Sequence, residues 1–357
     1  MSRRTASRIG NAALCAAALF LPAGLCRASA EPPPAESKAA DALQKPVFES
    51  IQREVNALFE KCRGAVVRVE ARDKHGELAG TGFFIDPHGT LYTSWTVGGD
   101  ESRDLVVCHG DKKYPARRLI ADFRCGVAIL KVDAETPFLP LGESRGLTVA
   151  SPVLTIGYPM DLPLTPSFGM VGGFDLKYLG RYFATTHIRA NVAVQRGQGG
   201  APLLDMHGQV VGVLISSLDQ GSASFVLPIE AAEKVRRDYV RFGEVRPGWV
   251  GMAVGPAAQG SGGSVAEVQD ILTDGPADKA GVERGDILLK VGDRAVRTPD
   301  DVIDASFFIT AEDPLKVKIA REGKEMDLQL TPAEPPVIKR SLLSPLANEQ
   351  SLEMEME

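Results

Sequence analysis

TGFFIDPHGTLYTS, at residues 81–94, contains two short runs of apolar, aromatic and β-branched residues with a turn between them. The turn is Asp86-Pro87-His88-Gly89, which combines the fixed φ of proline with the conformational freedom of glycine. Alternating strand-forming runs joined by such a turn predict a β-hairpin. The same pattern continues on both sides of this stretch.

Similar runs recur at short spacing from Ala65 to about Leu227. They are AVVRVEA, TGFFID, TLYTS, DLVVCH, YPARRLI, VAILKV, PVLTIG, HIRANVAV, QVVGVLIS and ASFVLP. Many short strands cut by turn residues predict an antiparallel all-β barrel or sandwich, and the number of runs suggests a pair of packed barrels. Residues 228–242 have a helical pattern and close this region.

The residues before this region predict an exported protein. Three arginines precede an apolar run at residues 12–25, and Ala28-Ser29-Ala30 offers a small-x-small cleavage site, so we expect a signal peptide at residues 1–30. Lipoprotein processing before Cys26 is the alternative, although Leu25 is larger than that processing prefers. Residues 31–47 are rich in Pro, Ala, Glu and Lys and predict a linker, followed by an amphipathic helix at residues 48–63.

Charge and cysteine content exclude several classes of function. The whole chain has a formal net charge of −6, and removal of four leader arginines makes it −10, which disfavours nucleic acid as a partner. Outside the leader the cysteines are Cys62, Cys108 and Cys125, too few for a disulfide framework. A Cys108–Cys125 disulfide is left open. The spacing matches no zinc pattern, so we predict no metal site and no cofactor.

A second region follows at residues 246–332. It contains a Gly/Ser-rich insertion at residues 259–264, a strand VAEVQDIL, the turn-rich segment DGPADKAGVERGDILLKVGD and two further strands, LKVKIAR and EMDLQLT. Between them, Thr298-Pro299-Asp300-Asp301 predicts the capped start of a helix. Residues 333–357 predict an acidic disordered tail.

The order of these pieces resembles the HtrA (Deg) family of exported serine proteases. The resemblance covers residues 48–332 and depends on TGFFIDPHGTLYTS, VAILKV, GQGGAPLLDMHGQVVGV, WVGM and DGPADKAGVERGDILLKVGD in this order. It implies a mainly β fold, with a chymotrypsin-like double β-barrel at residues 48–243 followed by a PDZ domain at residues 246–332.

The positions that match the family's catalytic triad hold other residues. The histidine position is Thr96, the aspartate position is Gly126 and the serine position is Gly199. A nucleophile, a base that titrates near neutrality and a carboxylate that orients the base are all required for acyl transfer. Their loss reduces turnover by a factor on the order of 10⁶. The oxyanion-type turn at Gly197 and Gly199 retains its backbone amides.

We expect structural or surface roles for the remaining nucleophiles and bases. Cys125 adjoins the aspartate position and lies away from the oxyanion-type turn. We assign structural or surface roles to four of the five histidines, namely His88, His109, His187 and His207. The resemblance therefore implies a pseudoprotease.

The PDZ-like region keeps its binding features. Trp249-Val250-Gly251-Met252 resembles the loop that receives a peptide's terminal carboxylate, and Val302 and Phe307 on the following helix are candidates for the side-chain pocket. The alternative is that these four residues form only a first strand with core side chains.

Three functions remain open on this sequence. The first is a silent HtrA-like protein of the periplasm or cell envelope that binds peptides, protein C-termini or unfolded proteins as scaffold, adaptor or holdase. The second is an active endopeptidase of protein quality control. The third is a regulatory subunit, in a homotrimer or in a hetero-assembly with an active relative.

Overall fold

The computed structural model describes residues 36–160, 162–218, 223–257 and 264–336. The chain divides into two units, residues 1–50 and Ile51–Glu357. The predicted signal peptide, most of the Gly/Ser-rich insertion and most of the acidic tail lie outside the described residues. Across the described ranges no helix has the length and apolar character needed to cross a membrane.

Helix α1, Glu36–Cys62, begins earlier than the sequence predicted. Residues 36–47, expected as part of a linker, are helical, and a short 3-10 turn follows at Arg63–Ala65. This segment contains several Ala, Lys, Leu and Gln residues, whose high helix propensity outweighs the prolines that suggested a linker. At the other end of α1, Leu58 and Cys62 are buried.

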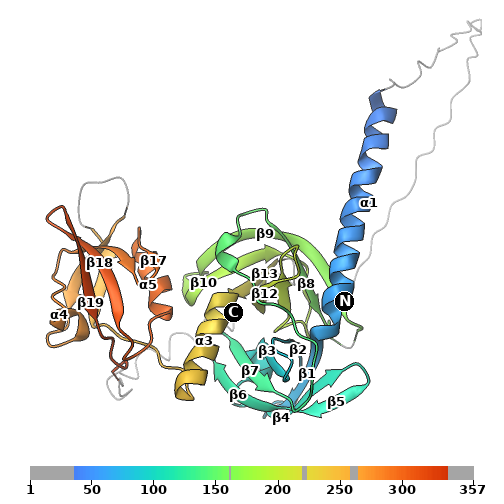
Figure 1. Ribbon diagram of the computed structural model, residues 1–357, viewed down its shortest axis with the longest axis horizontal. Helices are drawn as coiled ribbons and strands as arrows, with labels where there is room; N and C mark the ends of the chain where they lie inside the picture. Colours follow the sequence, from blue (N-terminus) through green and yellow to red (C-terminus); the bar gives the residue numbers. More distant parts are fainter. Residues whose placement is uncertain (1–35, 161, 219–222, 258–263, 337–357) are drawn as a thin grey trace, which may run out of the picture. The chain divides into compact units, whose positions relative to one another are not determined.

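The first sheet has seven strands in the order β5-β4-β1-β2-β3-β7-β6 (Figure 1). Their bounds are β1 Val66–Arg72, β2 Glu77–Phe84, β3 Thr90–Ser94, β4 Arg103–His109, β5 Lys112–Pro115, β6 Arg117–Asp122 and β7 Val127–Lys131. The predicted hairpin is confirmed, with Phe83 opposite Tyr92. Asp86 closes its turn by accepting hydrogen bonds from the backbone amides of His88 and Thr90, and Gly89 has a φ of 86°.

The second sheet closes into a barrel with the order β10-β13-β12-β11-β8-β9 (Figure 1). Its strands are β8 Pro152–Gly157, β9 Thr165–Tyr178, β10 Arg181–Asn191, β11 Pro202–Leu204, β12 Val210–Leu218 and β13 Ala223–Pro228. Side chains from both sheets, including Phe83, Ile129 and Leu154, share one apolar cluster. The two sheets therefore pack as one chymotrypsin-like domain, as predicted.

Helix α3, Ile229–Phe242, follows the barrel at the place the sequence indicated. Ala231, Ala232 and Val235 on one of its faces join the shared apolar cluster. The helix ends at Gly243, whose φ of 79° is a left-handed conformation that glycine adopts without strain.

The third sheet belongs to the PDZ domain and has the order β14-β15-β16-β18-β19, with β17 paired to β16. The bounds are β14 Met252–Pro256, β15 Ala266–Ile271, α4 Pro276–Lys279, β16 Ile287–Val291, β17 Arg294–Ala295, α5 Pro299–Phe307, β18 Leu315–Arg321 and β19 Lys324–Leu330. Thr298 and Asp301 form the predicted cap as a reciprocal capping box. An apolar core of its own, centred on Val268, Leu288 and Ile319, supports this sheet.

Candidate functional site

Thr96 and Gly199 lie beside each other. Thr96 is in the short helix α2, Trp95–Gly98, and its hydroxyl lies 2.7 Å from that of Ser94. A Cβ atom on Gly199 would lie 3.2 Å from Ser94 Oγ and 3.8 Å from Thr96 Oγ1. Within the described part of the chain, each of these two hydroxyls has the other as its hydrogen-bond partner.

Gly126 contacts the first residue of the same helix. Its carbonyl oxygen accepts a hydrogen bond of 2.7 Å from the backbone amide of Trp95. Its φ is 78°, and a Cβ atom on it would lie 2.6 Å from Cγ2 of Ile215. Ile215, on β12, thus occupies the space into which a side chain at position 126 would project, and no spacing in the sequence indicated this contact.

The oxyanion-type turn is held by Thr81. The backbone amide of Thr81 donates to the oxygen of Gly199 at 2.9 Å, and its hydroxyl donates to the oxygen of Gly197 at 2.8 Å. Gly197 and Gly200 both have a φ of 90°, so the turn depends on glycine at these positions. A Cβ atom on Gly197 would lie 2.5 Å from the oxygen of Tyr158, which leaves no space for a side chain.

The cysteines and His187 are further candidates for a chemical role. Cys62, Cys108 and Cys125 are unpaired, and burial raises the pKa of the Cys125 thiol. Burial also lowers the pKa of His187 to about 4, against the opposing effects of the Thr185 carbonyl and Asp304. Among the described residues no group of His, Cys, Asp and Glu could hold a metal ion.

A groove of about 520 Å³ lies between β14 and α5 of the PDZ domain. All six residues that the sequence indicated for peptide binding line it, namely Trp249, Val250, Gly251, Met252, Val302 and Phe307. Strand β14 is the edge strand of its sheet, paired on one side with β15. An edge strand beside an apolar groove allows a peptide to pair as an additional strand.

The loop before β14 is partly engaged within the domain. The backbone amide of Trp249 donates to the oxygen of Ala333 at 2.7 Å, so it is not free to receive a carboxylate. Gly251 has a φ of 75°, and the Trp249 ring lies 3.0 Å from the place of a Cβ atom there. The conformation of this loop therefore requires glycine at position 251.

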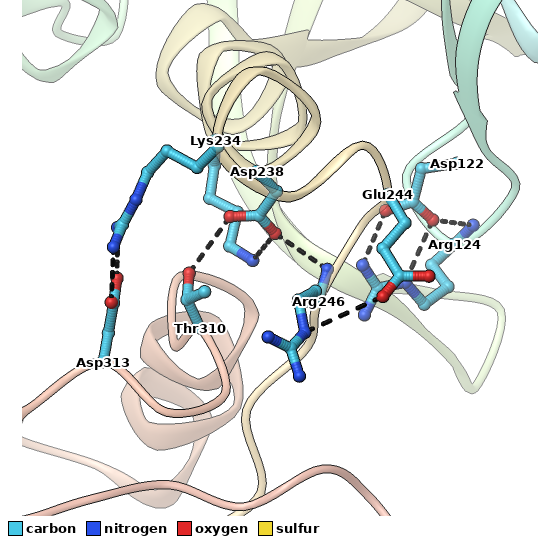
Figure 2. Close-up of polar contacts among 9 residues, drawn as sticks. Asp122, Arg124, Lys234, Asp238, Glu244, Arg246, Thr310 and Asp313 are labelled. Atoms are coloured by element: carbon cyan, nitrogen blue, oxygen red, sulfur yellow. Dashed lines mark hydrogen bonds and ion pairs between the residues drawn. The ribbon is translucent and has the colours of Figure 1, made fainter.

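Helix α5 also contacts the protease-like domain. Asp304 accepts hydrogen bonds from the Thr185 hydroxyl at 2.6 Å and from the Thr186 amide at 2.7 Å, both on β10. Beyond the helix, Thr310 donates to Asp238 of α3 at 3.1 Å, and Arg241 pairs with Asp313 (Figure 2). One wall of the groove is thus fixed to the neighbouring domain.

Family comparisons agree with both domains. The trypsin-like peptidase domain family matches residues 80–213, and the PDZ domain family matches residues 242–331. The fold and these matches define a trypsin-like peptidase domain joined to a PDZ domain. A trypsin-like peptidase domain followed by a PDZ domain supports assignment of the chain to the HtrA family.

Several relatives have the name probable periplasmic serine endoprotease DegP-like. The protein of Chlamydia pneumoniae is 27% identical over 291 residues, which is 78% of this chain and 59% of that protein. The protein of Pseudomonas putida (strain W619) is 29% identical over 272 residues, 73% of this chain and 57% of that protein. The chain therefore spans less than three fifths of the length of these curated relatives.

Solved structures share the fold. The HtrA-type protease AlgW with tripeptide superposes with a TM-score of 0.66 at 21% identity, covering 79% of this chain and 97% of that chain. The serine endoprotease from Yersinia pestis gives a TM-score of 0.57 at 24% identity, covering 79% and 98% respectively.

Proposed function

We propose that this protein is a catalytically silent HtrA homologue that binds peptides, protein C-termini or unfolded segments through its PDZ groove. It acts in the periplasm or cell envelope as scaffold, adaptor or holdase. The main support for binding is the groove between the free edge of β14 and α5, lined by all six residues expected to contact a peptide.

The residues at the triad positions support the loss of cleavage. Glycine at 199 carries no nucleophile, threonine at 96 is no base near neutral pH, and glycine at 126 carries no carboxylate. Ile215 already fills the space beside Gly126, which is consistent with a site that no longer holds an acidic side chain.

The relatives' names support the location and the alternative function. They are named periplasmic, which agrees with export directed by residues 1–30 and cleavage after Ala30. They are also named endoproteases, so an active peptidase is the second candidate. A homotrimer, or a regulatory role in a hetero-assembly with an active relative, is compatible with the first candidate.

The two candidates differ in a direct chemical test. The mature protein is incubated with a fluorophosphonate probe and separately with unfolded casein, with a heat-treated sample as control. We expect neither labelling above the heated sample nor casein fragments. Heat-sensitive labelling together with cleavage would show that the protein is an active serine peptidase.

Binding is tested in parallel with a groove variant. Val302→Glu places a charge in the groove, whereas Met326→Glu places the same charge on an exposed position of β19. Binding of unfolded casein or of peptides with free C-termini should be lost in Val302→Glu and retained in Met326→Glu. Equal binding by both variants would exclude the groove as the binding site.

A further inference from the structure

The PDZ groove has lining residues from the protease-like domain. Arg124 and Ala184 border the groove together with the residues of β14 and α5. Arg124 lies in the turn between β6 and β7, two residues before Gly126. The turn at the aspartate position thus places a cation at a binding groove in the other domain.

Arg124 is held in a fixed orientation by Asp122. Nε of Arg124 donates to Oδ1 of Asp122 at 2.9 Å, and Nη2 donates to Oδ2 at 2.6 Å (Figure 2). The Asp122 side chain is 3% exposed and also accepts from the backbone amide of Arg124. A guanidinium has five N–H groups, so both hydrogens of Nη1 and one of Nη2 remain to bind a further acceptor.

Contacts along α5 place Arg124 at the end of the groove where a terminal carboxylate would lie. Its guanidinium carbon lies 5.6 Å from the centroid of the Phe307 ring, and Phe307 is the last residue of α5. Just beyond the helix, the oxygen of Ile309 accepts a hydrogen bond of 2.9 Å from Gly248, the residue before Trp249. The loop of residues 249–252 therefore starts beside the end of α5 that Arg124 faces.

Domain docking keeps Arg124 at the groove. Phe307 is 5% exposed and packs within the apolar cluster of the protease-like domain. The Thr310–Asp238 hydrogen bond and the two Arg241–Asp313 hydrogen bonds join the segment after α5 to α3 (Figure 2). The guanidinium and the peptide loop are thus parts of one packed arrangement.

We propose that Arg124 binds the terminal carboxylate of a peptide in the PDZ groove, so that two domains together form the carboxylate site. This proposal rests on the proposed peptide-binding function. The amide of Trp249 is already used, and an arginine fork offers directed hydrogen bonds that replace this donor. Arg124 stays paired with Asp122, so the net charge of the pair is close to zero. The site therefore binds the ligand carboxylate through directed N–H donors of the guanidinium.

The test compares each peptide as a free acid and as a C-terminal amide. Fluorescent decapeptides ending in Val, Leu or Phe are titrated into the full mature protein and followed by anisotropy. The wild type should prefer the acid. Arg124→Gln should weaken acid binding roughly five- to twentyfold and leave amide binding unchanged, because a charge-assisted hydrogen bond is lost.

Two further variants sharpen the test. Arg117→Gln removes the same charge from an exposed position on β6 and should keep the wild-type preference for the acid. Arg124→Lys keeps the charge without the planar fork and should give an intermediate preference. If thermal melting shows that Arg124→Gln is unfolded, the preference of folded Arg124→Lys decides the matter.

The possible failures are distinguishable. An unchanged preference for the acid in Arg124→Gln, or in Arg124→Lys where that variant decides, would overturn the role of Arg124 and leave groove binding intact. Binding of neither acid nor amide by the wild type would instead contradict the proposed function itself, and with it this inference.

Discussion

At the scale of single residues, the Ile215 side chain fills the space beside Gly126. The positive φ of Gly126 disfavours any L side chain. In addition, a Cβ atom at position 126 would come too close to Cγ2 of Ile215. Position 199 is less restricted, since a Cβ there would meet Ser94 Oγ at 3.2 Å. Restoring the three triad side chains together is therefore opposed mainly at position 126.

Gly126→Asp should destabilise the protein by about 2–4 kcal/mol, from backbone strain and overpacking. Ile215→Ala removes the colliding methyl groups, so the double variant should lose less stability than the two single variants added together. Urea unfolding of all four proteins measures this coupling, and additive losses would show that Ile215 is not the obstacle.

Residues found by motif and residues found only in the structure differ in kind. Thr96, Gly199 and the loop at residues 249–252 could be located because short local patterns surround them. Thr81, Ile215 and Arg124 act on partners far away in the sequence. Contacts of that kind have no spacing rule, so sequence patterns alone did not predict them.

At the scale of helices and strands, α3 contains a buried ion pair. Lys234 and Asp238 are one turn apart, with side chains 0% and 2% exposed and a separation of 2.5 Å (Figure 2). Asp238 also accepts from the Thr310 hydroxyl and from the Arg246 amide, both at 3.1 Å. Burial lowers the pKa of Lys234, and the hydrogen bond with Asp238 opposes this effect.

Asp238→Ala should cost about 3–5 kcal/mol, because it leaves the Lys234 ammonium buried without a partner. The further change Lys234→Met should recover part of that loss, with a coupling of about 1–3 kcal/mol in a double-mutant cycle. Chemical unfolding measures each variant. A cycle that closes without coupling would mean that water reaches Lys234 once its partner is gone.

Elements with strong local signals were predicted, and elements with weak signals were not. Helices α3 and α5 have clear periodicity or caps and were expected near their observed bounds. Strand β9 was not expected, because Gly169, Gly172 and Gly173 interrupt its apolar pattern. A Cβ at Gly169 would lie 2.1 Å from the oxygen of Asn191, so close approach of β9 to β10 explains that glycine.

The stability of the whole molecule depends on groups that stay uncharged or paired when folded. His187 is buried, 3% exposed, with a pKa lowered to about 4. Asp286 is buried and Asp304 is partly buried, yet hydrogen bonds from Arg321 and Thr185 respectively outweigh burial and lower their pKa values. Protonation of all three groups therefore lowers the stability of the folded protein as the pH falls. His187 acts in one pH range and the two aspartates act in another.

Stability should fall in two stages as pH decreases. A histidine with a lowered folded pKa contributes stability above its ordinary pKa, so His187 should cost about 3 kcal/mol between pH 6.5 and 4. The aspartates lose their contribution only below about pH 4. Urea unfolding between pH 7.5 and 3 measures both stages. His187→Gln should remove the first stage and keep the second, and an unchanged first stage would exclude His187 as its cause.

Because Ile215 lies beside Gly126, the order in which positions 126 and 215 mutate affects whether catalysis can return. A mutation to an acidic residue at position 126 would place its side chain against Ile215 and destabilise the fold. This cost would come before any gain in catalytic activity. A return to catalysis along single steps would have to begin with a smaller residue at 215, a change with no catalytic reward of its own. The present arrangement therefore acts as an evolutionary ratchet, favouring refinement of binding over recovery of hydrolysis.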